Sequence, residues 1–497
     1  MLITDITAQT LELAKASLEN PIGADDPLAK ALTQPSNPTT GLAAYDLAPT
    51  AYTLYPVLTP LRNAIPRDGD GAGTQANWKA VTGININGMD VGVSEGNRGG
   101  IANMQVSDYN AVYRSLGLES FTTYEAQRAA KGLVDARATD TTALLRSLMI
   151  GEEKLILGGN NSLALGTTPA PVLVANAAGG TLAAATWSVI CVALTHAGLL
   201  TGSVPGGIRG EVTRTNPDGS QDVYGGGSAA KSANQTVVTA GATSSISASV
   251  ATVEGACGYA WFWGAAGAEV LGAITTINSV LITAAAAGTQ TAASLSGDNS
   301  RNNLVFDGIM TQVYKTGVGY MAAQPTGTAG TGTPLTSDGA GGIVEIDLAL
   351  QWFWDNFRVS PTAIWVSSQE QQNITRKILA TNGNAAQRFV LNVEQGNIKG
   401  GDLVRSYLNK FAMDGAQEIP IKLHPNAAKG TILFDTDVLN YSLADVPGVK
   451  RIRCRADYHQ IDWSQRSRKY EYGIYADEVL QIFAPFAFGM LTNIGNG

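Results

Sequence analysis

The sequence is poor in the residues that build disulfide frameworks and most metal centres. Its 497 residues include three cysteines and three histidines, none of them in the spacing of a zinc site. This usage excludes a small disulfide-stapled module and predicts free, buried thiols. Cys191 and Cys257 would still form a disulfide if their two strands faced each other. We expect no metal and no cofactor.

Charge and long hydrophobic runs are also scarce. Only 15% of the residues are charged and the formal net charge is −8, which argues against a dedicated nucleic-acid binder because phosphate contact needs clustered cations. No apolar run approaches the roughly 18 residues of a membrane span, and the N-terminus has neither the cationic start nor the apolar core of a secretion signal. These absences predict a protein that stays in the cytoplasm where it is made or assembled, with no membrane partner.

The sequence lacks the motifs of the common enzyme classes. It contains no Gly-x-Ser-x-Gly, no His-Glu-x-x-His, no Walker loop and no glycine fingerprint after a predicted strand. The acidic pairs Glu152-Glu153 and Asp477-Glu478 are adjacent in the sequence, and we interpret them as solvated or salt-bridged. We therefore predict that the protein is not an enzyme and has no catalytic residues.

What the sequence does contain is a long helical pattern between Phe121 and Gly159. Thr122 and Glu125 have the spacing of a capping box at its start, and the glycine pair at 158 and 159 is a plausible stop. At about 1.5 Å per residue such a helix would span roughly 50 Å, weakened locally by glycines 132 and 151. The stripe at helical spacing is Ala126, Ala130, Leu133, Thr141, Leu144, Leu148 and Leu155, and the charged Arg128, Arg137, Arg146, Glu152 and Glu153 lie mostly off it.

The N-terminal part of the chain has little core-forming sequence. Residues 1–41 are predicted to be a helix followed by an extended arm, because four prolines between residues 21 and 38 exclude regular structure there. Prolines within 54–67 predict a second extended segment. Residues 75–84 and 89–94 are predicted to pair as a hairpin around the Asn-Gly turn at 87–88, and residues 104–113 form a further strand. A hairpin of this kind is unstable alone, so we expect it to lie on a partner subunit.

Residues 165–296 differ in composition from the rest. Only eight of the residues between 161 and 295 are charged, and short alternating segments are separated by glycine-rich turns. This pattern predicts a β-sandwich with the aromatic segment Tyr259–Trp263 in its core. A low-complexity linker is the alternative, but the aromatic residues and the alternation argue against it. The predicted strands are 186–195, 209–215, 236–240, 245–250, 258–263 and 279–283.

Residues 300–497 return to mixed helices and strands. We expect helices over 303–317, 346–357 and 369–380 and a buried strand over 361–366, which together predict a sheet with helices packed on it. The strongest local positive charge lies between residues 450 and 469. It is either a solvated strand face with intersubunit salt bridges or a surface that contacts packaged nucleic acid without reading its sequence. Its residues are Lys450, Arg451, Arg453, Arg455, Arg466, Arg468 and Lys469.

Several stretches, in this order along the chain, resemble the major capsid proteins of tailed bacteriophages, which have the Hong Kong 97-type fold. The resemblance covers roughly residues 42–160 and 300–497, and residues 165–296 look like an inserted immunoglobulin-like domain. The matching stretches are Thr59–Arg67 with Trp78 for the start of the E-loop, Leu423-His424-Pro425 with Gly430–Phe434 for the axial domain, and Tyr470–Asp477 with Ala484-Pro485-Phe486 for the C-terminal peripheral-domain segment.

The resemblance implies an α+β fold and a structural role. Pentamers and hexamers of the chain would form an icosahedral virion shell around double-stranded DNA, assembled in the host cytoplasm with a separate scaffolding protein and a portal. Some relatives cross-link a loop lysine to a neighbour's asparagine, and Lys79 is the hairpin lysine here. The implied parts are an N-terminal arm (1–41), an E-loop hairpin with flanking strands (42–110), a peripheral domain with the spine helix (111–164), the inserted sandwich (165–296), an axial domain (297–445) and a C-terminal peripheral-domain segment (446–497).

Two other classes of function stay open at this point. An encapsulin-like compartment shell has the same fold, but that class is usually smaller and lacks an inserted sandwich. A surface adhesin or tail decoration protein would suit the Ala-, Gly- and Thr-rich sandwich. The lack of a secretion signal and the long helix argue against this last class.

Overall fold

The computed structural model describes residues 58–84, 92–101, 103–130, 135–216, 218–380, 403–413, 415–439, 446 and 448–497. The chain divides into two compact units, Met1–Tyr55 with Glu125–Ala136 and Pro56–Tyr124 with Arg137–Gly497. Helix α4 (Tyr124–Ala129) belongs to the first unit except for its first residue, and the remaining elements lie almost entirely in the second. The predicted arm over 1–41 lies outside the described residues. In the described part of the chain, no helix is long and apolar enough to cross a membrane.

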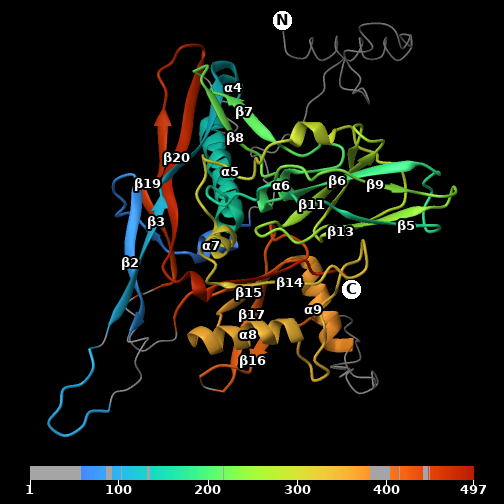
Figure 1. The fold of residues 1–497 in the computed structure, drawn as a ribbon. Helices are drawn as coiled ribbons and strands as arrows, with labels where there is room; N and C mark the ends of the chain where they lie inside the picture. The colour runs from blue at the N-terminus through green and yellow to red at the C-terminus, as the bar shows by residue number, and fades with distance from the viewer. Residues whose placement is uncertain are drawn as a thin grey trace, which may run out of the picture. The chain divides into compact units, whose positions relative to one another are not determined.

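A four-stranded sheet and one long helix lie side by side in the second unit (Figure 1). The strand order is β1 (Arg67–Asp68), β19 (Lys450–Asp462), β20 (Lys469–Ile482) and β4 (Arg114–Thr123). Helix α5 (Ala136–Gly158) contributes Leu144, Leu148 and Ile156 to the core that it shares with this sheet. Its 23 residues give a length of about 35 Å.

The predicted continuous helix over 121–159 is wrong at its start and in its continuity, although residues 124–129 and 136–158 are helical. Residues 121–123 belong to β4, which pairs with β20 along its full length, and the Thr122 hydroxyl lies 2.9 Å from the hydroxyl of Tyr472 instead of capping a helix. Helix α4 ends at Ala129 and α5 begins at Ala136, with residues 131–134 outside the described part. The glycine stop is confirmed, because α5 ends at Gly158.

A six-stranded mixed sheet forms a second layer. Helices α8 (Val344–Phe357) and α9 (Ser368–Ala380) place Phe353 and Ile374 in one core with Ile364 and Phe434 of the sheet. This confirms the predicted helices, strand and layering, although helix α7 (Ile309–Thr316) begins six residues later than the predicted 303. The strand order is β14 (Tyr320–Ala323), β21 (Gly489–Thr492), β18 (Ile432–Asp435), β15 (Ala363–Val366), β17 (Gln417–Leu423) and β16 (Ser406–Asn409).

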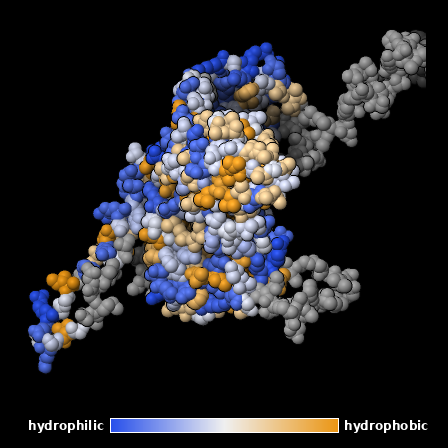
Figure 2. Space-filling model, turned by 45° about the vertical axis from the view of Figure 1, so that its right-hand side comes forward, coloured by the Kyte–Doolittle hydropathy of each residue, from blue (hydrophilic) through white to orange (hydrophobic). Residues whose placement is uncertain are grey.

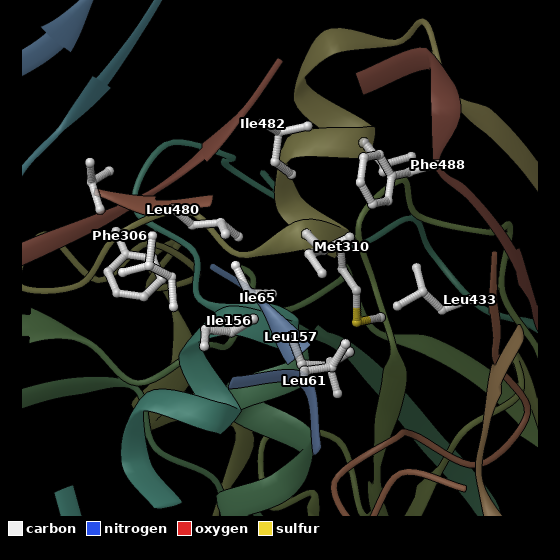
Figure 3. Packing of buried hydrophobic residues seen from close by; sticks show 14 of the residues in the cluster. Leu61, Ile65, Ile156, Leu157, Phe306, Met310, Leu433, Leu480, Ile482 and Phe488 are labelled. Atoms are coloured by element: carbon white, nitrogen blue, oxygen red, sulfur yellow. The ribbon is translucent and has the colours of Figure 1, made fainter. Parts of the chain in front are cut away.

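The main hydrophobic core joins both layers (Figure 3). It is built from side chains that are far apart in the sequence, from a short helix near residue 61, the end of α5, helix α7, strand β20 and the segment before β21. Because these elements share one core, the end of α5 is fixed relative to β20 and to the six-stranded sheet. The labelled members are Leu61, Ile65, Ile156, Leu157, Phe306, Met310, Leu433, Leu480, Ile482 and Phe488.

Residues 172–282 form two antiparallel sheets that share a core. All six predicted strands occur, and Tyr259, Trp261 and Trp263 lie between the sheets as expected. Cys191 and Cys257 are buried and free, as predicted. The three-stranded sheet has the order β13 (Ser279–Ile282), β10 (Ser245–Ser249) and β5 (Val172–Asn176). The four-stranded sheet has the order β12 (Val270–Thr275), β11 (Gly258–Gly264), β6 (Thr186–Leu194) and β9 (Gln235–Val238). In addition, β7 (Glu211–Thr215) pairs with β8 (Gln221–Gly225).

Candidate assembly site at the base of the ribbon

Strands β2 (Gln75–Ile84) and β3 (Met104–Val112) form a two-stranded antiparallel ribbon (Figure 1). The ring of Trp78 stacks on Tyr109 at 5.9 Å between centroids and meets Phe483 edge-on at 6.0 Å, so one face of the ribbon packs near β20. The predicted hairpin partner is wrong. Residues 92–94 are not in a strand and 85–91 lie outside the described part, while β2 pairs with the strand that was expected separately at 104–113.

The other face and the far part of the ribbon expose apolar side chains (Figure 2). Val81 pairs with Val106 across this face, and Val81, Met104 and Ile101 are 54%, 62% and 98% exposed. Lys79 lies on the same face, 3.5 Å from the carboxylate of Asp108. A two-stranded ribbon with exposed apolar residues is stable only when something packs on it or fixes its base.

The base of the ribbon begins with a short helix, α3 (Pro60–Ala64), instead of the predicted extended segment. Proline suits the first position of a helix, because its missing N–H would have no partner there. The carboxylate of Glu153, on α5, accepts hydrogen bonds from the backbone N–H groups of Leu61 and Arg62 at 2.9 and 2.7 Å. A side chain about 90 residues away thus caps α3, and this explains why local sequence did not reveal the helix.

Two arginines of the base bind carboxylates that are buried between α5 and the sheet. Arg67 donates to Glu152 at 2.5 Å and to Glu478 at 2.7 Å, and the Nε of Arg62 lies 3.1 Å from Glu152. Glu152, Glu153 and Glu478 are at most 1% exposed. The expectation that Glu152 and Glu153 lie off the buried stripe is therefore wrong, whereas the expected salt bridges of Glu152 and Glu478 are present.

Strand β19 completes this network with an aromatic ring and a peripheral acid. Both guanidinium groups lie over the ring of Tyr458, at 5.1 Å for Arg62 and 4.7 Å for Arg67, and the Tyr458 hydroxyl donates to Glu152. Arg67 also reaches the half-exposed Asp457 at 2.8 Å. We call these groups, Arg62, Arg67, Glu152, Glu153, Asp457, Tyr458 and Glu478, the ribbon clamp.

Burial perturbs the acid–base chemistry of the ribbon clamp. Desolvation, followed by the nearby charge of Glu152, raises the pKa of Glu478 to about 8 although Arg67 opposes the shift. Desolvation and Glu152 also raise the pKa of Tyr458. Desolvation raises the pKa of the adjacent Cys454 thiol to about 12. Burial by itself would lower the pKa of Arg67. The carboxylates of Glu478 and Glu152 outweigh this effect, so the pKa of Arg67 lies above its usual value.

A chain of hydrogen bonds leads from the ribbon clamp toward residues 172–282. His424 Nε2 lies 2.6 Å from Glu153 Oε1, and the N–H of Asn426 donates to His424 Nδ1 at 3.1 Å. The carbonyl of Asn426 accepts from His196 Nε2 at 2.7 Å, at the start of helix α6 (His196–Thr201). Burial lowers the pKa of His196 to about 4, so this ring is neutral at physiological pH.

The basic residues singled out in the sequence divide into two groups. Arg451, Arg453 and Arg455 hold the last residue of β1 and the segment after it, through Asp68 at 2.8 Å and the carbonyls of residues 70 and 73 at 3.1 and 3.0 Å. Lys450 is buried against two aspartates, 435 and 437. Toward the loop between β19 and β20, Arg466 and Arg468 are exposed, and Lys469 pairs with Glu471 and lies over the Phe121 ring.

The ribbon clamp was not found by sequence reasoning, although one signal for it exists. Leu144, Leu148 and Glu152 are spaced by four residues, so Glu152 continues the buried stripe of α5 by one turn. A charged residue at the end of an apolar stripe indicates a buried ion pair, because such residues are seldom fully buried unless they are paired.

Comparison with known proteins gives structural matches only. No family model matches the sequence, and no curated protein matches it. The matched solved structures include the capsid of the Myoviridae phage XM1, with 10% sequence identity and a TM-score of 0.40 over 90% of this chain and 97% of that chain. They also include the capsid of a native GTA particle, with 10% identity and a TM-score of 0.41 over 91% of this chain and 96% of that chain. The holo-SrpI encapsulin complex from Synechococcus elongatus also matches, with 9% sequence identity and a TM-score of 0.37 over 95% of this chain and 97% of that chain. The first two of these structures are named as capsids.

Proposed function

We propose that this chain is a structural shell subunit, the major capsid protein of a tailed bacteriophage. The observation that carries the proposal is the ribbon, whose base is fixed by buried ion pairs while its outer face exposes apolar residues. A projection held in place at its base and apolar beyond it is suited to bind a surface on another molecule. The resemblance of Thr59–Arg67 to the start of the capsid E-loop makes that molecule a second copy of this chain.

In this proposal, copies of the chain form pentamers and hexamers that close into an icosahedral shell around double-stranded DNA. Assembly takes place in the host cytoplasm with a separate scaffolding protein and a portal. The exposed cations near the loop between β19 and β20, Arg466 and Arg468, are the part of the basic cluster best placed for sequence-independent phosphate contacts. Arg451, Arg453 and Arg455 serve instead to hold the ribbon base within the subunit.

We also propose that residues 165–296 are an inserted domain of the immunoglobulin-like sandwich type. The two sheets with a shared aromatic core support this architecture. The distribution of strands between the two sheets differs from that of a constant-type immunoglobulin domain. When the seven strands of the two sheets are numbered in chain order, the first (β5), fourth (β10) and seventh (β13) form one sheet. A constant-type domain instead places its first, second, fourth and fifth strands in one sheet. The low charge of this segment fits a domain that makes no strong contact with DNA.

The test is assembly of the full-length chain. Expressed with its scaffolding protein, the chain is expected to give closed particles by electron microscopy. Val106→Asp on the exposed ribbon face is expected to stop assembly at free subunits or capsomers without changing the circular dichroism spectrum. Val238→Asp, at an exposed position of strand β9, is the matched control and should assemble normally.

Two outcomes would overturn the proposal. Persistently monomeric or filamentous wild-type product would exclude a shell subunit, and normal particles from Val106→Asp would exclude the ribbon as an assembly contact. Nuclease-protected DNA inside particles distinguishes a phage capsid from an encapsulin-like compartment, which would contain protein cargo.

A further inference from the structure

The ribbon clamp contains three buried acids and two partly buried bases. Arg67 pairs with Glu152 and Glu478 and Arg62 pairs with Glu152, whereas Glu153 is held by two backbone N–H groups and by His424. If every group carried its usual charge, one negative charge would be left over in a dry environment. An unpaired buried charge is costly, and a carboxyl group avoids this cost by keeping its proton.

His424 does not supply the missing positive charge. Its Nδ1 accepts the N–H of Asn426, so that nitrogen carries no proton, and its Nε2 donates to Glu153. This pattern of one donor and one acceptor is that of a neutral imidazole. Asp457 lies at the exposed edge and adds another negative charge to the ribbon clamp.

The geometry at Glu478 shows where a proton fits. Its Oε2 accepts from Arg67 at 2.7 Å, whereas its buried Oε1 has no hydrogen-bond donor. The guanidinium of Arg67 bridges this carboxyl group and that of Glu152, with Nη2 on Glu478 at 2.7 Å and Nη1 on Glu152 at 2.5 Å. Two carboxyl groups in this position share a proton, because one then donates to the other and neither keeps an unsatisfied buried oxygen.

The other titratable and charged neighbours of Glu478 do not replace this proton. On β19, Cys454 lies directly opposite Glu478, and Tyr458 already donates its proton to Glu152. On β4, Arg114 lies opposite Glu478; one Nη of its guanidinium donates to Asn161 at 3.4 Å and its buried Nε has no hydrogen-bond partner, but among the described residues no ion pair within 4.0 Å joins it to Glu478.

We propose that the ribbon clamp is a proton-binding site in which Glu478 holds a proton that it donates to Glu152, and that loss of this proton loosens the base of the ribbon. This device goes beyond the proposed shell function, since it acts within a single subunit. It makes the freedom of the assembly ribbon dependent on pH.

The direction of the pH dependence follows from the pKa of Glu478. That pKa is about 8 in the folded protein and returns to the ordinary value of 4.5 once the base opens. Between these two pH values the closed base binds more protons than the open base, so closure is favoured most at low pH and is weakened as the pH rises to 8. Above that pH the dependence disappears.

The experiment is hydrogen exchange on the unassembled full-length chain, read at the Leu61 and Arg62 amides and corrected for the intrinsic exchange rate at each pH. The opening equilibrium constant of the wild type is expected to rise with pH between 5 and 8, by at most tenfold per pH unit, and to level off above that. Glu478→Gln keeps the size of the side chain and fixes it in an uncharged form that can donate a hydrogen bond. The opening constant of this variant should therefore not rise between pH 5 and 8. Glu471→Gln, on the same strand in the half-exposed pair with Lys469, is the matched control and should behave as the wild type.

The proposal would be overturned if the opening constant of the wild type did not rise between pH 5 and 8, or if that of Glu478→Gln rose as in the wild type. If Glu478→Gln does not fold, infrared spectra of the wild type decide: the carbonyl band of a protonated carboxylic acid should be present at pH 6 and absent at pH 9.5, and its absence at both pH values would refute the shared proton. Neither measurement depends on particle formation, so failure here is distinguishable from failure of the shell proposal.

Discussion

Replacing Arg67 by methionine should open the base of the ribbon while the rest of the subunit stays folded. Methionine is long and unbranched, so it fills much of the same space without the charge. The substitution removes the Arg67 donor from Glu478 and one of two arginines from Glu152. Removing one partner of a buried ion pair typically costs about 3–5 kcal/mol.

The substitution also removes two weaker contacts of Arg67. The pair with the half-exposed Asp457 contributes about 0–1 kcal/mol, and the contact with the Tyr458 ring contributes about 0.5–2 kcal/mol. Arg62 stays on Glu152, which keeps the loss from growing further. We therefore expect a loss of about 3 kcal/mol at pH 7, the lower end of this range because Glu478 is mostly protonated at that pH, equivalent to an increase of about two orders of magnitude in the opening constant.

Hydrogen exchange resolves this loss by region. The amides of β2 and α3 should exchange much faster in Arg67→Met, whereas the amides of β11 in the sandwich core should not change. Arg214→Met is the control, because Arg214 forms its 2.6 Å ion pair with Asp222 at the surface and should cost less than about 1 kcal/mol. The reasoning is refuted if Arg67→Met affects the ribbon base no more than Arg214→Met affects its own strand.

Two further predictions concern α5 and the cysteine beside the ribbon clamp. Gly151→Ala should stabilise the protein by about 0.5–1 kcal/mol, since an added Cβ meets open space. Gly158→Ala should destabilise it by about 1–3 kcal/mol, because its Cβ would lie 2.4 Å from the His196 ring. Urea unfolding measures the free energy of unfolding of both variants. Cys454, buried and with a raised pKa, should resist alkylation at pH 8 in the wild type. It should react faster in Arg67→Met because opening of the base exposes the thiol and removes the desolvation, which outweighs loss of the Arg67 charge that lowers this pKa. The buried Cys191 should stay unreactive in both, as mass spectrometry of the labelled peptides would show.

The elements that the sequence predicts well are those whose signal is local. Strands β10 and β11 alternate or concentrate aromatic residues over a few positions and are bounded by glycine-rich turns, so their existence and burial can be read directly. Helix α9 is another example, because Ser367 accepts a hydrogen bond from the N–H of Glu370 as a local cap should.

The errors occur where a distant partner decides between local alternatives. The Thr122–Glu125 spacing is a genuine cap signal, but pairing of β4 with β20 uses Thr122 in the sheet instead. In the same way, β2 pairs with β3 across an intervening segment of about twenty residues, although an Asn-Gly turn lies closer. Strand pairing depends on which face can be buried, and this information lies outside the local segment.

The ribbon clamp is the extreme case, because the atoms that Arg67 joins are 85 and 411 residues away in the sequence. Its presence also needs a reason other than stability. Well-packed apolar residues of similar volume are often as stabilising as a buried ion-pair network, or more so, because they avoid the cost of desolvating charges. A network of this kind gains its value from what an apolar cluster cannot provide: a fixed direction for the ribbon, set by the donors of Arg62 and Arg67, and a strength that changes when a single proton leaves Glu478.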